Sequence, residues 1–352
     1  SMKGIQKNDF AMIMGYPGTT DRYLTSYGVQ LALEQSNDAI VKIRDKKLFI
    51  MREDMQANAA IRIQYAAKYA QIANYWKYFI GQSKGLKRLK VYDKKLELEN
   101  VFQQWVVADN ARKEKYGEAL GLIKTAYDDL KKYNLARVYY SEALAGGAEI
   151  IGLARRCQNL QIELKKDSVD VKKVEKIIGG LKNAMADFYK DFNAGTDQKL
   201  LVATFAMFYK DVAKEFHPDV FKTIESKFKS DFNKYAAMVF EKSVFASKDK
   251  FEKFLNAYSL KVLEKDPAFI AGLSISNAIT TLRENTNSIN EKIAKGNRLF
   301  VAGLREMQPD RKFYPNANST MRLTFGKVMD YQAADAINYN YFTTIDGIIE
   351  KN

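Results

Sequence analysis

The sequence predicts a mainly α-helical fold, with one large multi-helix domain and a short β-strand segment near each end of the chain. The 352 residues contain only 5 prolines and 19 glycines, whereas residues of high helix propensity are abundant. Apolar residues recur at steps of three and four through most of the chain, which is the spacing of one helix face. The prolines fall between the expected helices, where they end one element and precede the next.

Composition and charge narrow the class of protein. A hydrophobic content of 47% with 28% charged residues is typical of an ordered chain that buries a full core. No apolar run reaches the ~20 residues of a membrane-spanning helix. The net charge of +14 raises the question of nucleic acid, but the lysines alternate with acidic residues and no nucleic-acid motif accompanies them. We expect a helical surface that favours acidic partners weakly and does not bind nucleic acid.

A strand is predicted at the start of the chain. Asp9–Tyr16 is a short apolar run that fits a buried strand, and Pro17-Gly18 ends it. From about Leu31 the periodicity becomes helical. One later segment has the four-three spacing of a helix-bundle seam, formed by Tyr116, Leu120, Ile123, Tyr127 and Leu130.

The stretch Ala57–Ile80 is predicted to be a helix without the usual charged side. Its apolar stripe consists of Ile61, Tyr65, Tyr69, Ile72, Trp76 and Phe79. Its other side carries small or apolar groups around one carboxamide, namely Ile63, Ala67, Ala70 and Asn74. Such a helix is expected to lie between other elements, with Asn74 buried. A buried carboxamide needs partners, and either a neighbouring backbone or a ligand could supply them. The residues alone favour the backbone.

Further helices follow by the same criteria. The pattern breaks at Gly81–Lys90, and Gly146-Gly147 predicts a bend or a helix junction. Asp266-Pro267 is expected to stop one helix and start the next. Two further apolar stripes run from Val174 to Phe192 and from Leu201 to Phe216.

The end of the chain changes character. Ser319–Val328 alternates apolar and polar residues with a period of two, which predicts a strand, and Thr343–Gly347 resembles a further strand or turn. A helical block between two strand segments is the pattern of a helical insertion within a β-domain. We assign residues 1–18 and 319–352 to strand segments of that domain, and residues 19–318 to the helical domain.

Motifs for catalysis or metal binding are missing from the sequence. The single cysteine, Cys157, is expected to be a buried or half-buried helix thiol. The single histidine, His217, precedes Pro218 and is expected at a helix end. There is no phosphate-binding loop, no histidine pair at helical spacing and no nucleophile elbow. We therefore expect no catalytic residue, metal or cofactor in this chain.

Four stretches, taken in order, resemble one family. DFAMIMGYPGTTDRYLTSYGV, KYAQIANYWK, YPNANSTMRLTFGKV and YFTTIDGIIEK are similar to segments of the bacterial dipeptidyl peptidases of types seven and eleven, serine-peptidase family 46. The resemblance covers essentially the whole chain. It implies a chymotrypsin-like double barrel that carries this helical domain as an insertion, with the barrel strands at both ends of the chain. It also implies that the catalytic His, Asp and Ser lie outside this segment, which alone is expected to be inactive.

The resemblance assigns a role to Asn74. The family uses an Asn of the helical domain, in an Asn-Tyr-Trp setting, to accept hydrogen bonds from the substrate's N-terminal ammonium, and Asn74-Tyr75-Trp76 matches that setting. Such a bond is charge-assisted, and an acylated N-terminus would lose it. Tyr75 lies off the apolar stripe and either lines the cleft or packs, whereas Trp76 lies on the stripe and is expected in the core.

The expected partners are an oligopeptide with a free N-terminus and the peptidase barrels of the parent chain, and a homodimeric parent is one option. The resemblance implies a parent in the periplasm or at the cell surface of a Gram-negative bacterium. Ser1-Met2 resembles a remnant of tag cleavage, and no signal peptide is expected in this chain. The alternative function is a stand-alone basic helical binding or adaptor protein, which would not need strand segments at its ends.

Overall fold

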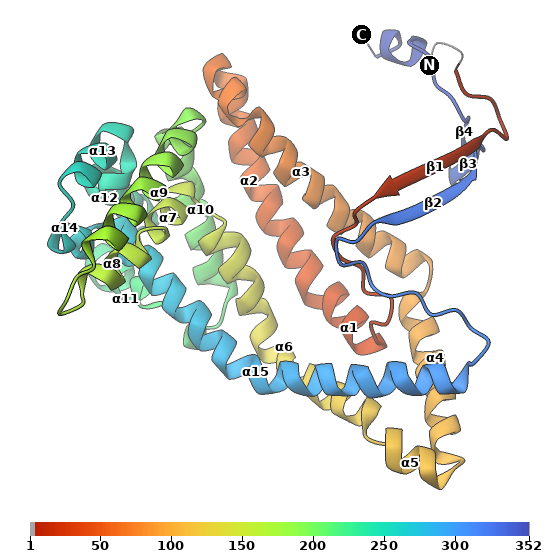
Figure 1. The fold of residues 1–352 in the computed structure, drawn as a ribbon. Coiled ribbons are helices and arrows are strands. Elements are labelled where there is room, and N and C mark those ends of the chain that lie inside the picture. Colours follow the sequence, from red (N-terminus) through yellow and green to blue (C-terminus); the bar gives the residue numbers. More distant parts are fainter. Residues whose placement is uncertain (1–3, 352) are drawn as a thin grey trace. The chain divides into compact units, whose positions relative to one another are not determined.

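The computed structural model describes residues 4–351. Helices make up 72% of the chain and its few strands are short, so the prediction of a mainly α fold is confirmed (Figure 1). The chain divides into two compact units. One is helical and spans Thr25–Met307, and the other combines the segments before Thr25 and after Met307. The predicted boundaries at residues 18 and 318 lie inside the second unit.

The elements of the helical unit follow one another with short connections. In chain order they are α1 (Ser26–Leu31), the π-helix η1 (Ala32–Ser36), α2 (Asn37–Ala57), α3 (Ala59–Arg88), α4 (Val91–Val107), α5 (Asn110–Tyr116), α6 (Ala119–Tyr139), the π-helix η2 (Tyr140–Ala145), α7 (Glu149–Arg155), α8 (Gln158–Leu164), α9 (Val171–Lys190), α10 (Ala194–Asp211), the 3₁₀ turn η3 (Lys214–Phe216), α11 (Asp219–Phe228), α12 (Phe232–Lys242), the 3₁₀ turn η4 (Val244–Ala246), α13 (Lys248–Asn256), α14 (Leu260–Lys265) and α15 (Pro267–Met307).

Helices α2 and α3 form an antiparallel pair (Figure 1). Asn37 near the start of α2 donates to Gln82 and to Ser83 near the end of α3, each at 3.0 Å. The break predicted at Gly81–Lys90 occurs only at the end of that range, because α3 continues through Gly81 and Gly85 to Arg88 and only Leu89 and Lys90 separate it from α4. Tertiary pairing with α2 outweighs the ~1 kcal/mol that each helical glycine costs relative to alanine.

The long helix α15 organises the rest of the helical unit. It packs along α6 and against α7, and α7–α14 gather around its N-terminal half (Figure 1). Their shared core is rich in aromatic rings that are almost fully enclosed, among them Tyr139, Phe205, Phe208, Phe221, Phe245, Phe251 and Phe269. The seam predicted from Tyr116 to Leu130 lies in the interior except for Leu120, which is partly exposed. Asp266-Pro267 separates α14 from α15, as predicted.

The junction predicted at Gly146-Gly147 is confirmed. The π-helix η2 ends at Ala145, and α7 begins after Ala148. A Cβ atom on Gly147 would lie 1.9 Å from the Ala143 carbonyl oxygen and 2.6 Å from Thr204 Oγ1 of α10. No side chain fits there, so glycine lets η2 approach α10 closely.

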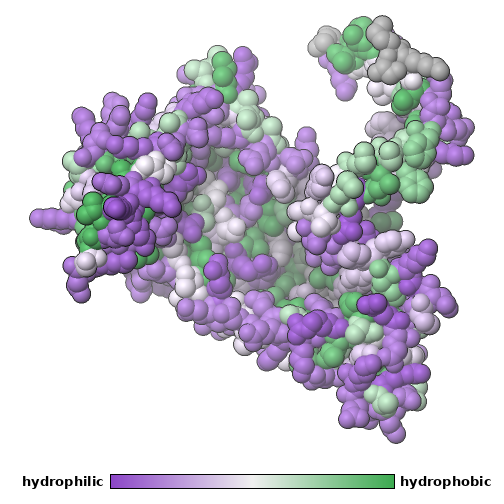
Figure 2. All heavy atoms as spheres, viewed as in Figure 1, coloured by the Kyte–Doolittle hydropathy of each residue, from purple (hydrophilic) through white to green (hydrophobic). Residues whose placement is uncertain are grey.

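The second unit contains two small antiparallel sheets. Strand β1 (Phe10–Gly15) pairs with β2 (Arg322–Lys327), and Met12 lies opposite Phe325. Both predicted strands therefore exist. The prediction that the first is buried is wrong for this chain, because its side chains are exposed, for example Phe10 at 70% and Ile13 at 72%. The two strands carry much of the hydrophobic colour of that segment in Figure 2, since a two-stranded sheet has no second layer to cover it.

Short polar and aromatic contacts hold the flanking loops of this unit together. The Tyr23 hydroxyl donates to the Tyr314 carbonyl at 2.5 Å, and its ring stacks on Phe313. Beyond β2 the chain forms a hairpin of β3 (Tyr331–Ala334) and β4 (Ile337–Tyr339), followed by α16 (Asp346–Ile349). The strand considered at Thr343–Gly347 is absent, because the chain turns there into α16.

Candidate functional site

Helix α3 carries the residues that the sequence singled out, and its N-terminal cap separates it from α2. The Asn58 side chain accepts hydrogen bonds from the backbone N–H groups of Ala60 at 2.8 Å and Ile61 at 3.3 Å. Asn58 has an extended backbone, with φ of −145°. The cap satisfies N–H groups that have no partner inside the helix. It thereby defines the start of α3 at Ala59 rather than at the predicted Ala57.

Asn74 lies on the exposed side of α3. Ala67 and Ala70 on the same side are also exposed, and Ile63 is 79% exposed. The prediction that this side is covered, with a buried Asn74, is therefore wrong for this chain. The absence of charged side chains at these positions does not require another element to pack against them. Only Tyr65 of α3 is fully buried. Within residues 4–351 the Asn74 carboxamide has no hydrogen-bond partner.

The two residues that follow Asn74 differ in their surroundings. The Tyr75 side chain is 49% exposed, and the Arg44 guanidinium of α2 lies 5.3 Å from its ring centroid. Trp76 is only half-buried, so the expectation that it lies in the core is wrong for this chain. Its indole N–H is shielded from solvent and has no acceptor in the described part of the chain. The expected cleft-lining role of Tyr75 stays a prediction.

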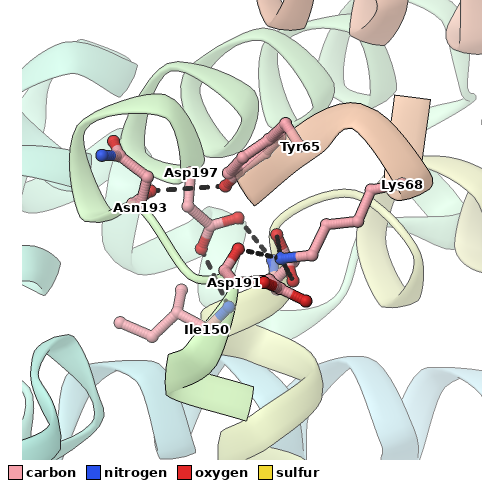
Figure 3. Close-up of polar contacts among 7 residues, drawn as sticks. Tyr65, Lys68, Ile150, Asp191, Asn193 and Asp197 are labelled. Carbon is pink, nitrogen blue, oxygen red and sulfur yellow. Dashed lines mark hydrogen bonds and ion pairs between the residues drawn. The ribbon is translucent and has the colours of Figure 1, made fainter. Parts of the chain in front are cut away.

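A cluster of polar side chains, which we call the α3 anchor, fastens the first half of α3 to the body of the helical unit (Figure 3). It consists of Tyr65, Lys68, Glu149, Asp191, Asn193 and Asp197.

Lys68 is the cation of the α3 anchor. Its ammonium donates to both carboxylate oxygens of Glu149, at 3.0 and 2.7 Å, and to the backbone carbonyl of Asp191. Tyr65, one turn earlier, is fully buried and donates from its hydroxyl to the Asn193 carbonyl at 3.4 Å. Both side chains point from α3 toward the starts of α7 and α10 (Figure 3).

Asp197 is the buried acid of the α3 anchor. Its carboxylate accepts from the first backbone N–H groups of α7, those of Glu149 at 2.6 Å and Ile150 at 2.9 Å. Burial raises the pKa of Asp197 to about 7, and the negative charge of Glu149 acts in the same direction. Protonation of this carboxyl therefore falls near neutral pH.

A second polar contact joins the α2–α3 pair to α10. Asp54 near the end of α2 accepts from the Thr196 hydroxyl at 2.7 Å and from the Lys199 ammonium at 2.6 Å. The apolar cluster at this junction is small, with Ile50, Met51, Tyr65 and Leu200 as its buried members. The helix that carries Asn74 is therefore fixed at its base by specific polar contacts around a modest apolar patch.

The lone cysteine and histidine lie elsewhere. Cys157 is completely buried, as predicted, but it lies in the turn between α7 and α8 rather than inside a helix, and burial raises the pKa of its thiol to about 12. His217 follows the 3₁₀ turn η3, so the prediction of a helix end is confirmed, and its Nε2 lies 2.9 Å from the Val212 carbonyl. The ring borders a cavity of about 370 Å³ that Tyr133, Tyr140 and Asn277 also line. The described residues contain no group of acidic, histidine or cysteine side chains that could hold a metal ion.

Sequence reasoning missed the α3 anchor. Lys68 and Glu149 are 81 positions apart, and Asp197 caps a helix 47 positions before it in sequence. Helical periodicity places Tyr65 on the packed stripe, but it gives no information about which distant acid meets Lys68. The one local signal is the lysine itself, which sits beside a stripe that is otherwise apolar or aromatic.

Comparison with known proteins agrees with the resemblance of the sequence motifs. The family described as Peptidase S46 matches this chain over residues 1–352. Dipeptidyl-peptidase 7 of Porphyromonas gingivalis is 38% identical over 100% of this chain and 48% of its own length. The Asp/Glu-specific dipeptidyl-peptidase of Flavobacterium psychrophilum is 34% identical over 100% of this chain and 48% of its own length.

A solved structure shares the fold. The crystal structure of Porphyromonas endodontalis DPP11 in complex with the dipeptide Arg-Glu superposes with a TM-score of 0.81 at 25% identity, over 99% of this chain and 49% of that one. The chain thus spans about half the length of the relatives that it matches. No helix in the described residues is long and apolar enough to cross a membrane. The match across all of its residues shows that this chain belongs to the Peptidase S46 family.

Proposed function

We propose that the chain is the helical domain of a serine-type dipeptidyl peptidase, and that it holds the N-terminus of an oligopeptide so that cleavage releases a dipeptide. In this proposal Asn74 accepts hydrogen bonds from the substrate ammonium, and the helices restrict the length of the cleft. The catalytic Ser and His, the peptidase double barrels and the acyl-transfer chemistry belong to the rest of the parent protein.

The observation that carries the proposal is the state of Asn74. Its carboxamide is exposed in the middle of a long helix and has no protein partner within residues 4–351. A side-chain carbonyl that is held by a fixed helix and is not already bonded can accept from an ammonium. The α3 anchor supports the required rigidity, because it fixes the preceding two turns of the same helix.

The surface of α3 around Asn74 is more typical of a face that binds another molecule or domain than of one that stays open to solvent. The exposed side of α3 presents Ile63, Ala67 and Ala70 before Asn74, with the exposed Arg62 and Lys77 beside them. Monomeric proteins seldom leave such a contiguous apolar face on a surface helix, and contiguous apolar patches commonly mark binding surfaces. We infer that this face meets the substrate and the parent's catalytic domain.

The named relatives support anchoring of the amine as the shared task of this segment. Relatives named Dipeptidyl-peptidase 7 and relatives named Asp/Glu-specific dipeptidyl-peptidase both match the whole chain. What these enzymes have in common by name is the release of dipeptides, which requires a free N-terminus at a fixed distance from the cleaved bond. We extend the proposal to a periplasmic or cell-surface location in a Gram-negative bacterium.

The test compares the complete parent protein with its Asn74→Ala variant on fluorogenic dipeptide substrates, each with a free and with an acetylated N-terminus. Loss of one charge-assisted hydrogen bond is expected to lower kcat/KM by about 10- to 100-fold for the free-amine substrates. Asn287→Ala, the removal of an exposed carboxamide from α15, is the matched control and should leave kcat/KM within about twofold.

The outcomes separate the hypotheses. Equal activity of the Asn74→Ala protein would return Asn74 to a role unrelated to substrate. Failure of the wild-type parent to release dipeptides would remove the exopeptidase function and leave the stand-alone helical binding protein as the alternative.

A further inference from the structure

We propose that Arg44 is a positioning residue for the amine-binding face of α3, because it fixes the ring of Tyr75 beside Asn74. The inference rests on the proposed function and adds to it a residue of α2 that the family motif does not contain. Arg44 contacts two other elements at once, the middle of α3 and the π-helix η2.

Arg44 pairs with Glu142 through one hydrogen bond and one close ionic contact, and its buried Nε makes no hydrogen bond within the described residues. Arg44 Nη2 donates to Glu142 Oε1 at 2.9 Å, and Arg44 Nε lies 2.9 Å from Glu142 Oε2. Both side chains are only 17% exposed. A planar guanidinium that turns two nitrogens toward one carboxylate has a preferred orientation, which a lysine ammonium cannot reproduce. The plane of the Arg44 head group is therefore set by Glu142.

The Glu142 carboxylate that pairs with Arg44 is carried by a π-helical backbone. Glu142 lies in η2, the π-helical segment that follows α6. The buried Lys47 of α2 donates to the Gly146 carbonyl just beyond that segment. π-Helical turns are rare and occur preferentially at functional sites. Two cations of α2, one turn apart, thus contact η2 at Glu142 and the residue that follows η2, Gly146.

Arg44 also contacts α3, the helix that carries Asn74. Its guanidinium carbon lies 5.3 Å from the centroid of the Tyr75 ring, within the range of a cation–π contact. Tyr75 is half exposed and directly follows Asn74. The guanidinium therefore connects Glu142 to the ring and restricts its side-chain torsions. A ring that is held in one place gives the amine-binding face of α3 one boundary of constant position.

The geometry predicts an effect on binding rather than on chemistry. Arg44→Lys keeps the positive charge but loses the second nitrogen that faces Glu142 and the guanidinium over the Tyr75 ring. In the complete parent protein we expect KM for free-amine dipeptide substrates to rise about tenfold with kcat within about twofold of wild type. Lys42→Gln is the matched control. It removes an exposed α2 cation that pairs with Asp211, and it should leave KM unchanged.

A double-mutant cycle tests whether Arg44 acts through Tyr75. If it does, Arg44→Lys should change KM by less than about twofold in a Tyr75→Ala background. Glu142→Asp, which shortens the carboxylate that orients Arg44, should reproduce the rise in KM and serves if Arg44→Lys does not fold. Thermal unfolding of each variant verifies that the compared proteins are folded.

The possible results have distinct meanings. An unchanged KM in Arg44→Lys, or a rise that persists without the Tyr75 ring, overturns the positioning role. A wild-type parent without dipeptide release overturns the proposed function and this inference with it. Full activity of Asn74→Ala combined with the predicted behaviour of Arg44→Lys would overturn the role of Asn74 and sustain that of Arg44.

Discussion

The ammonium of Lys68 on α3 lies 2.7 Å from the carboxylate of Glu149 at the start of α7. The two side chains are 25% and 26% exposed, so the pair is partly withdrawn from water. The positive charge of Lys68 also favours the ionised form of the buried Asp197. One cation of α3 therefore interacts with two acidic side chains of α7 and α10 and helps to hold α3 in position.

Removing that cation should destabilise the helical unit. Lys68→Met leaves Glu149 without its partner in a partly desolvated place, and we expect the free energy of unfolding to fall by about 2–3 kcal/mol. Chemical denaturation followed by circular dichroism measures it. Lys295→Met is the control, since its pair with Glu118 is about half exposed on both sides and should contribute less than about 1 kcal/mol. Equal losses in the two variants would contradict the anchoring role.

Asp197 should make stability depend on pH. Its pKa is about 7 in the folded chain and near 3.9 in an unfolded one, so the folded state holds the proton more tightly between these values. The stabilisation from this group is complete below about pH 4 and is lost as the pH rises toward 7.

The comparison with Asp197→Asn isolates this group, because all other titrating residues are shared. As the pH rises from 4 to 7, the wild type should lose up to about 4 kcal/mol relative to the variant. The Asn carbonyl retains an acceptor for the α7 N–H groups. Parallel pH profiles of unfolding for the two proteins would show that Asp197 ionises with an ordinary pKa.

Two glycines should respond to alanine in opposite directions. Gly147→Ala places a Cβ 1.9 Å from the Ala143 carbonyl oxygen, so we expect a loss of about 2–4 kcal/mol or failure to fold. Gly180→Ala lies inside α9 with no atom near the added Cβ and should stabilise by about 0.5–1 kcal/mol. Unfolding midpoints report both changes, and a stable Gly147→Ala protein would refute the close approach.

The Cys157 thiol should be unreactive in the folded chain. It is completely buried and its pKa is raised to about 12, so almost no thiolate exists at neutral pH. A thiol-specific chromogenic reagent should modify it only at the rate of unfolding, and fully in denaturant. Rapid modification of the native protein would show that the core around α7 and α8 opens locally.

The sequence alone determined the helical class, two of the helix junctions and the two end strands, whereas the role of Asn74 stays a prediction. Periodicity, proline positions and glycine pairs are local signals, and helices are formed by local hydrogen bonds, so Gly146-Gly147 and Asp266-Pro267 could be placed without knowledge of distant contacts. The matched motif around Asn74-Tyr75-Trp76 supplied the hypothesis of amine binding, which no spacing rule contains.

Only the tertiary structure decided which sides of these helices are covered. Periodicity identifies an apolar side of α3 but not the presence of a neighbour, so the exposure of Asn74 and the run of α3 through Gly81 were not predictable. The pairing of Lys68 with Glu149, and of Arg44 with Glu142, joins residues 81 and 98 positions apart. Such charge pairs depend on how folded helices pack, because a charged side chain in sequence gives its sign but not its partner.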